Sequence, residues 1–257
     1  WGTTPVASPA VQPVNTGSEL AIADIGGRPV AGGRFRTGLL YRVSGALVGR
    51  DDLAHLGGVG LRRLFDMRSE VEDREQLSAW AAGQGIDYRH FPVSIGRLSD
   101  LLAMAHEAAA SAEVAARILR SVYLRILDEQ GRTLAGIVDA MVDGLPAGFG
   151  CAAGKDRTGV LAALIQSAVG VDDAAIVEDY RKLAPDVGRL RKMLVEFLPS
   201  VDPNGAGISI LLGAAGETME VTLAHLAEGW GGAAGYLEAH GLAADRLGDL
   251  RRQLIET

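Results

Sequence analysis

The stretch "FGCAAGKDRTGV", residues 149–160, contains the only cysteine of this 257-residue chain. The residues up to Gly150 are typical of a short buried strand. From Arg157 to Val169 the sequence is apolar nearly all round, which indicates a buried helix that ends at Gly170. Cys151 therefore lies where a strand is expected to end and a helix to begin. In open α/β sheets this is the edge at which ligands bind.

The residues between strand and helix have the composition of an anion-binding turn. Gly154 can adopt a positive φ, which a curled nest of backbone N–H groups requires. The helix that begins near Arg157 adds free N–H groups and the positive end of its dipole. The Arg157 guanidinium can donate two hydrogen bonds to one phosphate. The sequence thus predicts a phosphate cradle built from Ala152, Ala153, Gly154, Lys155, Asp156 and Arg157.

The position of Cys151 predicts a nucleophile aimed into this cradle. The same electropositive field favours the thiolate, which can attack phosphorus and form a phosphocysteine that water then hydrolyses. Backbone N–H groups and Arg157 stabilise the developing charge, so no metal or other cofactor is expected. The Thr158 hydroxyl is placed to donate a hydrogen bond to the sulfur. Asp156 is the first choice for the acid that protonates the leaving oxygen, and Asp66, at the end of its own strand, is the second.

Other interpretations of the cysteine and its loop were weighed against this one. A lone cysteine is often a buried apolar side chain without chemistry. A nucleotide-binding P-loop requires Ser or Thr after its lysine, whereas Lys155 is followed by Asp156. A single cysteine also excludes an internal disulfide or a multi-cysteine metal site, and it disfavours arsenate reduction, which commonly needs resolving thiols.

The rest of the chain alternates short apolar runs with helical patterns. This alternation predicts an α/β fold with a mostly parallel central sheet flanked by helices, a helical insertion and a helical C-terminus. Residues 1–17, rich in Pro, Ser and Thr, are expected to be a loose arm, and 18–257 a single domain. Strands are expected in "LAIADIGG", "LLYRV", "LRRLFDMR", "IDYRHFPV" and "PAGFG". Helical spacing of apolar residues over 98–129 is followed by a separate helical pattern in "LAGIVDAMVDG".

Composition limits the partners. The net charge is −7 and the sequence holds no block of basic residues, which argues against nucleic-acid binding. No apolar run reaches the roughly 18 residues of a membrane span. No signal-peptide pattern is visible, and because the sequence does not begin with methionine, a removed leader and hence the location are left open.

At this point the residues carry a family resemblance. "CAAGKDRTG" resembles the signature loop Cys-x5-Arg-Thr of the protein tyrosine phosphatase superfamily. Its Gly-Lys-Asp-Arg-Thr-Gly ending is similar to bacterial phosphatases of the B type, which act on phosphotyrosine, phosphoserine or phosphothreonine, and phosphoinositides. The stretches "ADIGG", "GLLYR", "LFDMRSEVE" and "EDY" resemble further motifs of that family in the same order, so that the resemblance extends over most of the chain.

The resemblance implies a tyrosine phosphatase in which Cys151 is the nucleophile, Arg157 the phosphate clamp and Asp156 the general acid. It implies that Lys155 helps to hold additional phosphate and that the helices of residues 98–129 correspond to a lid. The implied partners are phosphoprotein or phosphoinositide substrates, with inorganic phosphate as product.

The sequence departs from the family where polar side chains are usual. Gly150 replaces the histidine that normally precedes the cysteine, and Ala21 and Ala23 replace two polar residues of an N-terminal motif. These departures motivate a second hypothesis, a phosphate-binding module with little or no turnover. If the missing histidine limits the rate, the substitution Gly150→His should raise it.

Overall fold

The computed structural model describes residues 21–46, 49–96, 98–183 and 187–257. The arm expected at residues 1–17 lies outside the described residues. The strands are β1 (Ile22–Asp24), β2 (Pro29–Val30), β3 (Gly33–Phe35), β4 (Leu40–Ser44), β5 (Arg63–Asp66), β6 (Asp87–His90), β7 (Ala147–Cys151) and β8 (Ile255–Glu256). The helices are α1 (Arg50–Gly58), α2 (Glu75–Gly83), α3 (Leu98–Ala110), α4 (Ala112–Val142), α5 (Asp156–Ala168), α6 (Asp173–Leu183), α7 (Val187–Phe197), α8 (Ile208–Leu212), α9 (Gly216–Trp230), α10 (Ala233–Ala239) and α11 (Ala244–Leu254).

The main sheet has the strand order β1-β4-β7-β5-β6. The pairs β4·β7, β5·β7 and β5·β6 are parallel, and only the edge strand β1 runs antiparallel to its neighbour. This arrangement confirms the predicted α/β fold with a mostly parallel sheet. Strand β7 is the middle strand, so Cys151 lies at the carboxyl edge of the sheet, beside Ser44 of β4 and close to the end of β5. The short strands β2, β3 and β8 form a second, antiparallel sheet.

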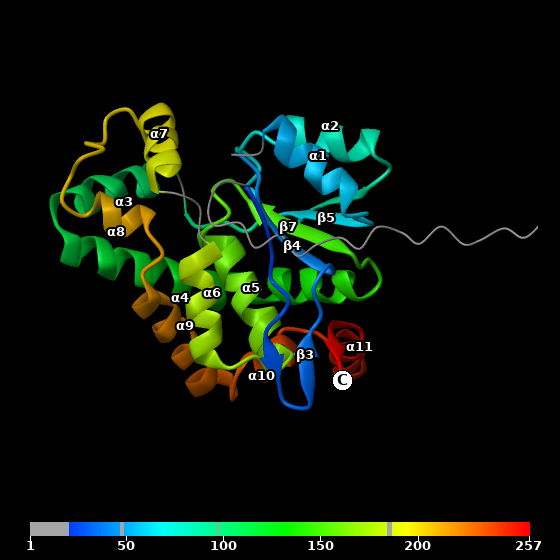
Figure 1. The fold of residues 1–257 in the computed structure, drawn as a ribbon. Coiled ribbons are helices and arrows are strands. Elements are labelled where there is room, and N and C mark those ends of the chain that lie inside the picture. Colours follow the sequence, from blue (N-terminus) through cyan, green and yellow to red (C-terminus); the bar gives the residue numbers. More distant parts are fainter. Residues whose placement is uncertain (1–20, 47–48, 97, 184–186) are drawn as a thin grey trace, which may run out of the picture.

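Helices cover both faces of the main sheet (Figure 1). On one face α1 and α2 pack on a small apolar cluster that includes Leu56, Leu64 and Leu77. The large core lies on the other face, where α4 and α5 pack beneath β7. Helix α5 is buried nearly all round, as its composition predicts, because α4, α6, α9 and α10 all contact it.

Helix α4 is longer than the sequence pattern predicts. The helical pattern at 98–129 and the one in "LAGIVDAMVDG" were expected to be separate, but residues 112–142 form one continuous helix. Gly131 lies within this helix, against the His240 side chain, where a Cβ would have no room. The Ser111 hydroxyl accepts a hydrogen bond from Val114 N and caps the start of α4. The lid role expected for residues 98–129 stays a prediction.

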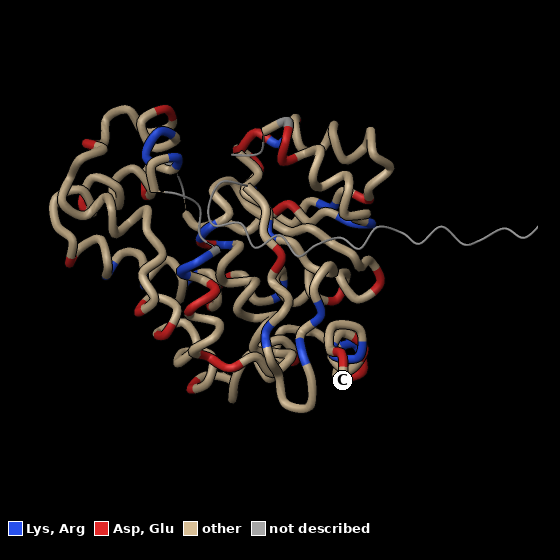
Figure 2. The backbone as a smooth tube through the Cα atoms, viewed as in Figure 1, with Lys and Arg blue, Asp and Glu red and all other residues tan. Residues whose placement is uncertain are grey.

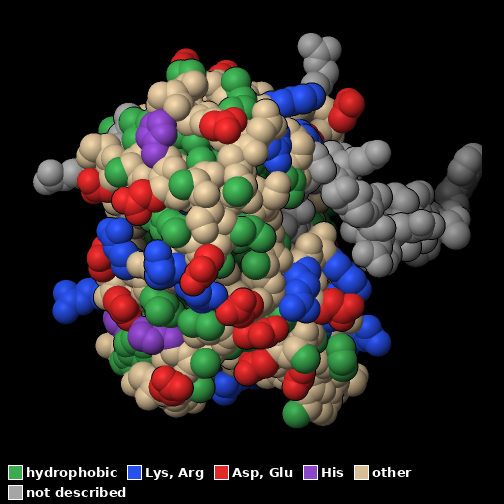
Figure 3. Space-filling model, turned by 90° about the vertical axis from the view of Figure 1, so that its left-hand side faces the viewer, with side chains coloured by type: hydrophobic (Ala, Val, Ile, Leu, Met, Phe, Trp, Pro, Cys, Tyr) green, Lys and Arg blue, Asp and Glu red, His purple; other side chains and the backbone are tan. Residues whose placement is uncertain are grey.

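Helices α3, α7 and α8 form a lobe at one end of α4 (Figure 1). Its own apolar cluster consists of Ala105, Leu194, Val201 and Ile208. Figure 2 shows acidic and basic residues interspersed over the fold, and on the face in Figure 3 hydrophobic side chains are scattered among both signs of charge. None of the described helices is long and apolar enough to cross a membrane.

Candidate active site

The loop from Cys151 to Arg157 joins the central strand to the buried helix α5. Gly154 has φ +66°, the left-handed conformation that its place in the turn predicts. A Cβ at Gly154 would lie only 2.1 Å from the Ser44 Oγ, so the close approach of β4 also requires glycine. This glycine therefore sets both the curl of the loop and its distance from the neighbouring strand.

Carbonyl groups of the loop accept hydrogen bonds from β4 and from the segment that follows β4. Arg42 Nη2 donates to the Gly154 carbonyl oxygen at 2.6 Å. Gly45 N and Ala46 N donate to the carbonyl oxygens of Cys151 and Ala152 at 2.7 and 2.9 Å. In a trans peptide the following N–H group points away from the carbonyl. The loop thus turns several N–H groups to its other side, as an anion cradle requires.

Thr158, in the first turn of α5, lies beside Cys151 at the end of β7. The Thr158 hydroxyl donates a hydrogen bond to Cys151 Sγ at 3.2 Å. Cys151 is 2% exposed and Thr158 is fully buried. A positioned hydroxyl donor stabilises negative charge on the sulfur, so this contact suits a thiolate that attacks and later departs.

Arg157 is held in place by a carboxylate that the sequence analysis did not single out. Glu72 Oε2 and Oε1 accept hydrogen bonds from Arg157 Nη1 and Nη2 at 2.7 and 2.8 Å. Arg157 Nη1 also donates to the Met67 carbonyl oxygen at 3.2 Å, and Ser69 N donates to Glu72 Oε2 at 2.6 Å. Glu72 is the last residue of the "LFDMRSEVE" stretch, which begins in β5, and the pattern of that stretch does not predict its contact with the loop.

Charges explain the ionisation of this pair. Burial alone raises the pKa of Glu72, but its hydrogen bonds with Arg157 and the arginine charge outweigh burial and lower it to about 2. Burial acts to lower the pKa of Arg157, yet the charges of Cys151 and Glu72 raise it overall. Both side chains therefore stay charged near neutral pH, and the guanidinium plane is fixed by a two-bond contact.

Lys155 and Asp156 form a close pair at the start of α5. Lys155 Nζ lies 2.7 Å from Asp156 Oδ1, but the angles are not those of a hydrogen bond, and this buried oxygen has no directed donor. The lysine is only 3% exposed, and its Nζ donates to the carbonyl oxygens of Leu211 and Gly213 at 2.9 and 3.3 Å. The Lys155 ammonium group thus contacts the end of α8.

The carboxylate of Asp66, the second candidate for the general acid, is hydrogen-bonded to Arg68 and Tyr88. Its carboxylate accepts hydrogen bonds from Arg68 Nη2 at 2.5 Å and from the Tyr88 hydroxyl at 2.8 Å. Arg68 N and Nε also donate to it, and Asp66 is 2% exposed. The structure places Asp66 in a buried ion pair that shapes the segment after β5.

Gly150 has no room for the histidine that family resemblance suggested. A Cβ at Gly150 would lie 2.0 Å from the Val43 carbonyl oxygen and 3.1 Å from the Val43 Cβ. Val43 and Gly150 are register partners in the parallel pair of β4 and β7, so the contact is part of the sheet. The substitution Gly150→His must first separate the two central strands, which argues against a gain in rate.

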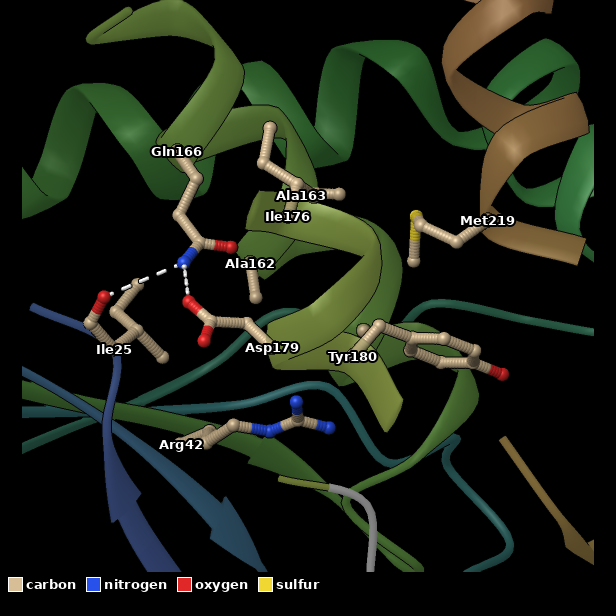
Figure 4. Close-up of a pocket in the computed structure, with 10 residues that line it drawn as sticks. Ile25, Arg42, Ala162, Ala163, Gln166, Ile176, Asp179, Tyr180 and Met219 are labelled. Carbon is tan, nitrogen blue, oxygen red and sulfur yellow. Dashed lines mark hydrogen bonds between the residues drawn. The ribbon is translucent and has the colours of Figure 1, made fainter. Parts of the chain in front are cut away.

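Buried polar residues link α5 and α6 to the first strands of the chain (Figure 4). Gln166 Nε2 donates to Asp179 at 2.7 Å, and Arg28 pairs with the same carboxylate from the segment after β1. Figure 4 shows Arg42 rising from β4 toward α6, the helix that carries Asp179 and Tyr180. These contacts join α5 and α6 to the segment around β1.

A buried cysteine and an arginine held by a carboxylate thus lie at the two ends of a loop between a central parallel strand and a helix. A sequence model of the tyrosine phosphatase family matches residues 22–256. The chain belongs to this family and is a protein tyrosine phosphatase. The match runs from the first strand to the last and so contains the whole site.

Individual relatives agree with this assignment. A candidate tyrosine-protein phosphatase of Cupriavidus necator is 30% identical over 217 residues, which cover 83% of this chain and 78% of that protein. The triple specificity protein phosphatase PtpB of Mycobacterium tuberculosis is 29% identical over 156 residues, or 56% of each chain. The core catalytic domain of the PP-IP phosphatase SIW14 from S. cerevisiae matches at a TM-score of 0.35 and 15% identity, covering 64% of this chain and 94% of that one. A TM-score this low supports no further conclusion.

Proposed function

We propose that this phosphatase hydrolyses phosphate monoesters through a phosphocysteine on Cys151. The observation that carries the proposal is the hydrogen bond from the Thr158 hydroxyl to Cys151 Sγ. Cys151 begins the loop, and Arg157, which Glu72 holds in place, ends it. Nucleophile, sulfur-stabilising hydroxyl and phosphate clamp are thus supplied within eight consecutive residues, 151–158.

In the first step the Cys151 thiolate attacks phosphorus. The S–P bond forms as the ester P–O bond breaks, and the departing oxygen takes a proton from the Asp156 carboxyl group. Arg157 and the loop N–H groups hold the non-bridging oxygens and stabilise the charge that develops on them. Asp156 is favoured as the acid because Asp66 is already bound by Arg68 and Tyr88.

In the second step water attacks phosphorus. The water proton passes to the Asp156 carboxylate, a P–O bond forms and the S–P bond breaks. The Thr158 hydroxyl stabilises the thiolate that leaves, and inorganic phosphate is released. Each turnover returns Cys151 as thiolate and Asp156 as acid, so no cofactor is consumed.

The substrates we propose are phosphotyrosine proteins, with phosphoserine or phosphothreonine proteins and phosphoinositides as further candidates. The name of the mycobacterial relative, a triple specificity phosphatase, supports a breadth of this kind. Holding an additional phosphate through Lys155 would require its Nζ to leave the carbonyl groups at the end of α8. A substrate with an additional phosphate at Lys155 therefore needs this rearrangement.

A substrate panel tests the proposal. Phosphotyrosine peptide, phosphothreonine peptide and phosphoinositide are each incubated with wild type and with Cys151→Ser, and released phosphate is measured. We expect release from phosphotyrosine by the wild type and none by the variant. Binding of the peptide without release by the wild type would instead support the module with little or no turnover that the changes at Gly150, Ala21 and Ala23 suggested.

The acid assignment has its own test. The variant Asp156→Asn should slow a substrate with a poor leaving group by on the order of 100-fold and an activated aryl phosphate far less. Equal losses on both substrates would remove the acid role from Asp156.

A further inference from the structure

Arg42 is a buried cation that takes no part in the steps proposed above. It lies in β4, the strand beside β7, and it is 4% exposed. Successive side chains of a strand point to opposite faces of the sheet. Because Tyr41 and Val43 pack in the small apolar cluster on the side of α1 and α2, Arg42 and Ser44 point to the other face, where α5 lies.

The charge of Arg42 has no direct counter-charge among the described residues, since none of their ion pairs includes it. Asp179 of α6 acts on it from beyond ion-pair distance, and its carboxylate is bound by Arg28 and Gln166. The guanidinium makes its hydrogen bond to the loop instead, from Nη2 to the Gly154 carbonyl oxygen at 2.6 Å. A buried charge without a partner is costly, so an anion bound at the loop would be favoured there.

The hydrogen bond from Arg42 fixes one peptide of the Cys151 loop. In a trans peptide the N–H of Lys155 points away from the Gly154 carbonyl group that Arg42 holds. This N–H lies at the start of α5 and donates to no acceptor among the residues that the structure describes. A cation bound to the carbonyl oxygen polarises the peptide and makes its N–H a stronger donor. Arg42 thus prepares the Lys155 N–H for an anion on the other side of the loop.

Gly154 makes a fixed peptide necessary. A residue without a Cβ lets the adjoining peptide turn more freely, and a Cβ is excluded here because it would lie 2.1 Å from Ser44 Oγ. If the peptide between Gly154 and Lys155 turned over, its carbonyl oxygen would face the phosphate and repel it. The orientation must therefore be held by a side chain, and Arg42 donates to this carbonyl group.

We propose that Arg42 is a positioning residue of the phosphate cradle, which directs the Lys155 N–H toward the phosphate by holding the Gly154 carbonyl group. This inference rests on the proposed function, because it requires the loop to bind the phosphate of the substrate. It predicts that loss of Arg42 weakens the binding of phosphate oxygens whatever the leaving group is.

The most specific test follows the Lys155 N–H itself. The sequence has three lysines, Lys155, Lys182 and Lys192, so labelling with ¹⁵N-lysine gives three backbone amide signals. Lys182→Arg and Lys192→Arg assign these signals, since both side chains are exposed. Inorganic phosphate is titrated to saturation into the wild type and into Arg42→Met. We expect phosphate to shift the Lys155 signal of the wild type and to leave that of Arg42→Met near its free position.

Kinetics give a second readout, with Arg63→Met as the matched control. Arg63 in β5 also donates to a backbone carbonyl oxygen, that of Ala140, but it lies at the opposite end of the sheet from Cys151. We expect Arg42→Met to lower kcat/KM about tenfold on both phenyl phosphate and 4-nitrophenyl phosphate, and to weaken inhibition by phosphate. Arg63→Met should change neither. Arg42→Lys keeps the charge with a shorter reach and should show an intermediate loss.

Thermal unfolding shows which variants are folded. If Arg42→Met is not, Arg42→Lys carries the test, and its Lys155 shift and its inhibition by phosphate should both be weaker than those of the wild type. A folded Arg42 variant with the Lys155 shift and the phosphate inhibition of the wild type would overturn the inference, as would a loss on only one of the two esters.

The wild type separates the two levels of the account. If phosphate does not shift the Lys155 signal of the wild type, the proposed cradle fails and the inference with it. If phosphate shifts this signal equally in the wild type and in the folded Arg42 variant, the inference alone fails.

Discussion

Glu72 binds both terminal nitrogens of Arg157, at 2.7 and 2.8 Å, from a segment 85 residues earlier in the chain. This carboxylate fixes the plane of the guanidinium before any phosphate arrives, so less conformational entropy is lost on binding. The phosphate clamp that we propose is therefore a pair of residues rather than one arginine.

The first prediction concerns this pair. Glu72→Gln leaves Arg157 buried without its counter-charge and free to turn. We expect kcat/KM to fall at least tenfold and the affinity for the product phosphate to weaken, because truncating one partner of a buried charge pair typically costs about 3 kcal/mol. Glu70→Gln is the control, since the Glu70 side chain is 71% exposed and lies two residues away. Similar kinetics for the two variants would contradict a clamping role.

The same pair predicts how stability depends on pH. The pKa of Glu72 falls from an ordinary value of 4.5 to about 2 in the folded protein. A lowered pKa stabilises the fold fully above the unfolded value, and this contribution is lost as the pH falls from about 4.5 toward 2. Urea unfolding should therefore show a gap between wild type and Glu72→Gln that is constant near neutral pH and closes in this acid range. A gap that stays the same down to pH 3 would refute the account of the pair.

A third prediction concerns Thr158. Removing its hydroxyl in Thr158→Ala takes a hydrogen bond from the Cys151 sulfur, so breakdown of the phosphocysteine should slow more than its formation. Rapid-mixing kinetics should then show a burst of leaving-group release followed by a slower steady rate. Thr158→Ser keeps the hydroxyl and should show no larger burst than the wild type. A Thr158→Ala enzyme without a burst and with an unchanged steady rate would argue against this role.

Gly150 supports a fourth prediction. Gly150→Ala places a Cβ against the Val43 carbonyl oxygen in the middle of the sheet, and we expect it to lower the free energy of unfolding by about 3 kcal/mol. Gly229→Ala is the control, because an exposed glycine near the end of α9 has open space around it and alanine favours helix. Chemical denaturation of both variants checks this. Equal stability of Gly150→Ala and wild type would mean that the strands separate at little cost.

The fold and the loop could be predicted from local patterns. The strand ending at Cys151, the positive φ of Gly154 and the buried helix α5 all follow from residues close together in the sequence. The partners of the loop could not be predicted in this way. Glu72 reaches Arg157 only because the sheet order brings segments together that lie far apart in the sequence.

The surroundings of two single positions could not be predicted from the sequence. Asp66 at the end of its strand was the second choice for the general acid, and the Arg68 side chain, two residues later, turns back onto it. Gly150 looked like the loss of a functional histidine, whereas the register of β4 against β7 leaves no space there. Neither the contact between Asp66 and Arg68 nor the distance between Gly150 and Val43 can be derived from a sequence pattern.

The most direct test of the account is to trap the covalent intermediate. Wild type and Cys151→Ser are mixed with 4-nitrophenyl phosphate, quenched with acid within the first turnovers, digested and analysed by mass spectrometry. The account predicts one added phosphoryl group on Cys151 in the wild type, none at position 151 in the variant, and no turnover by the variant. Turnover by the wild type without any phosphoryl group on Cys151, or equal turnover by Cys151→Ser, would contradict it.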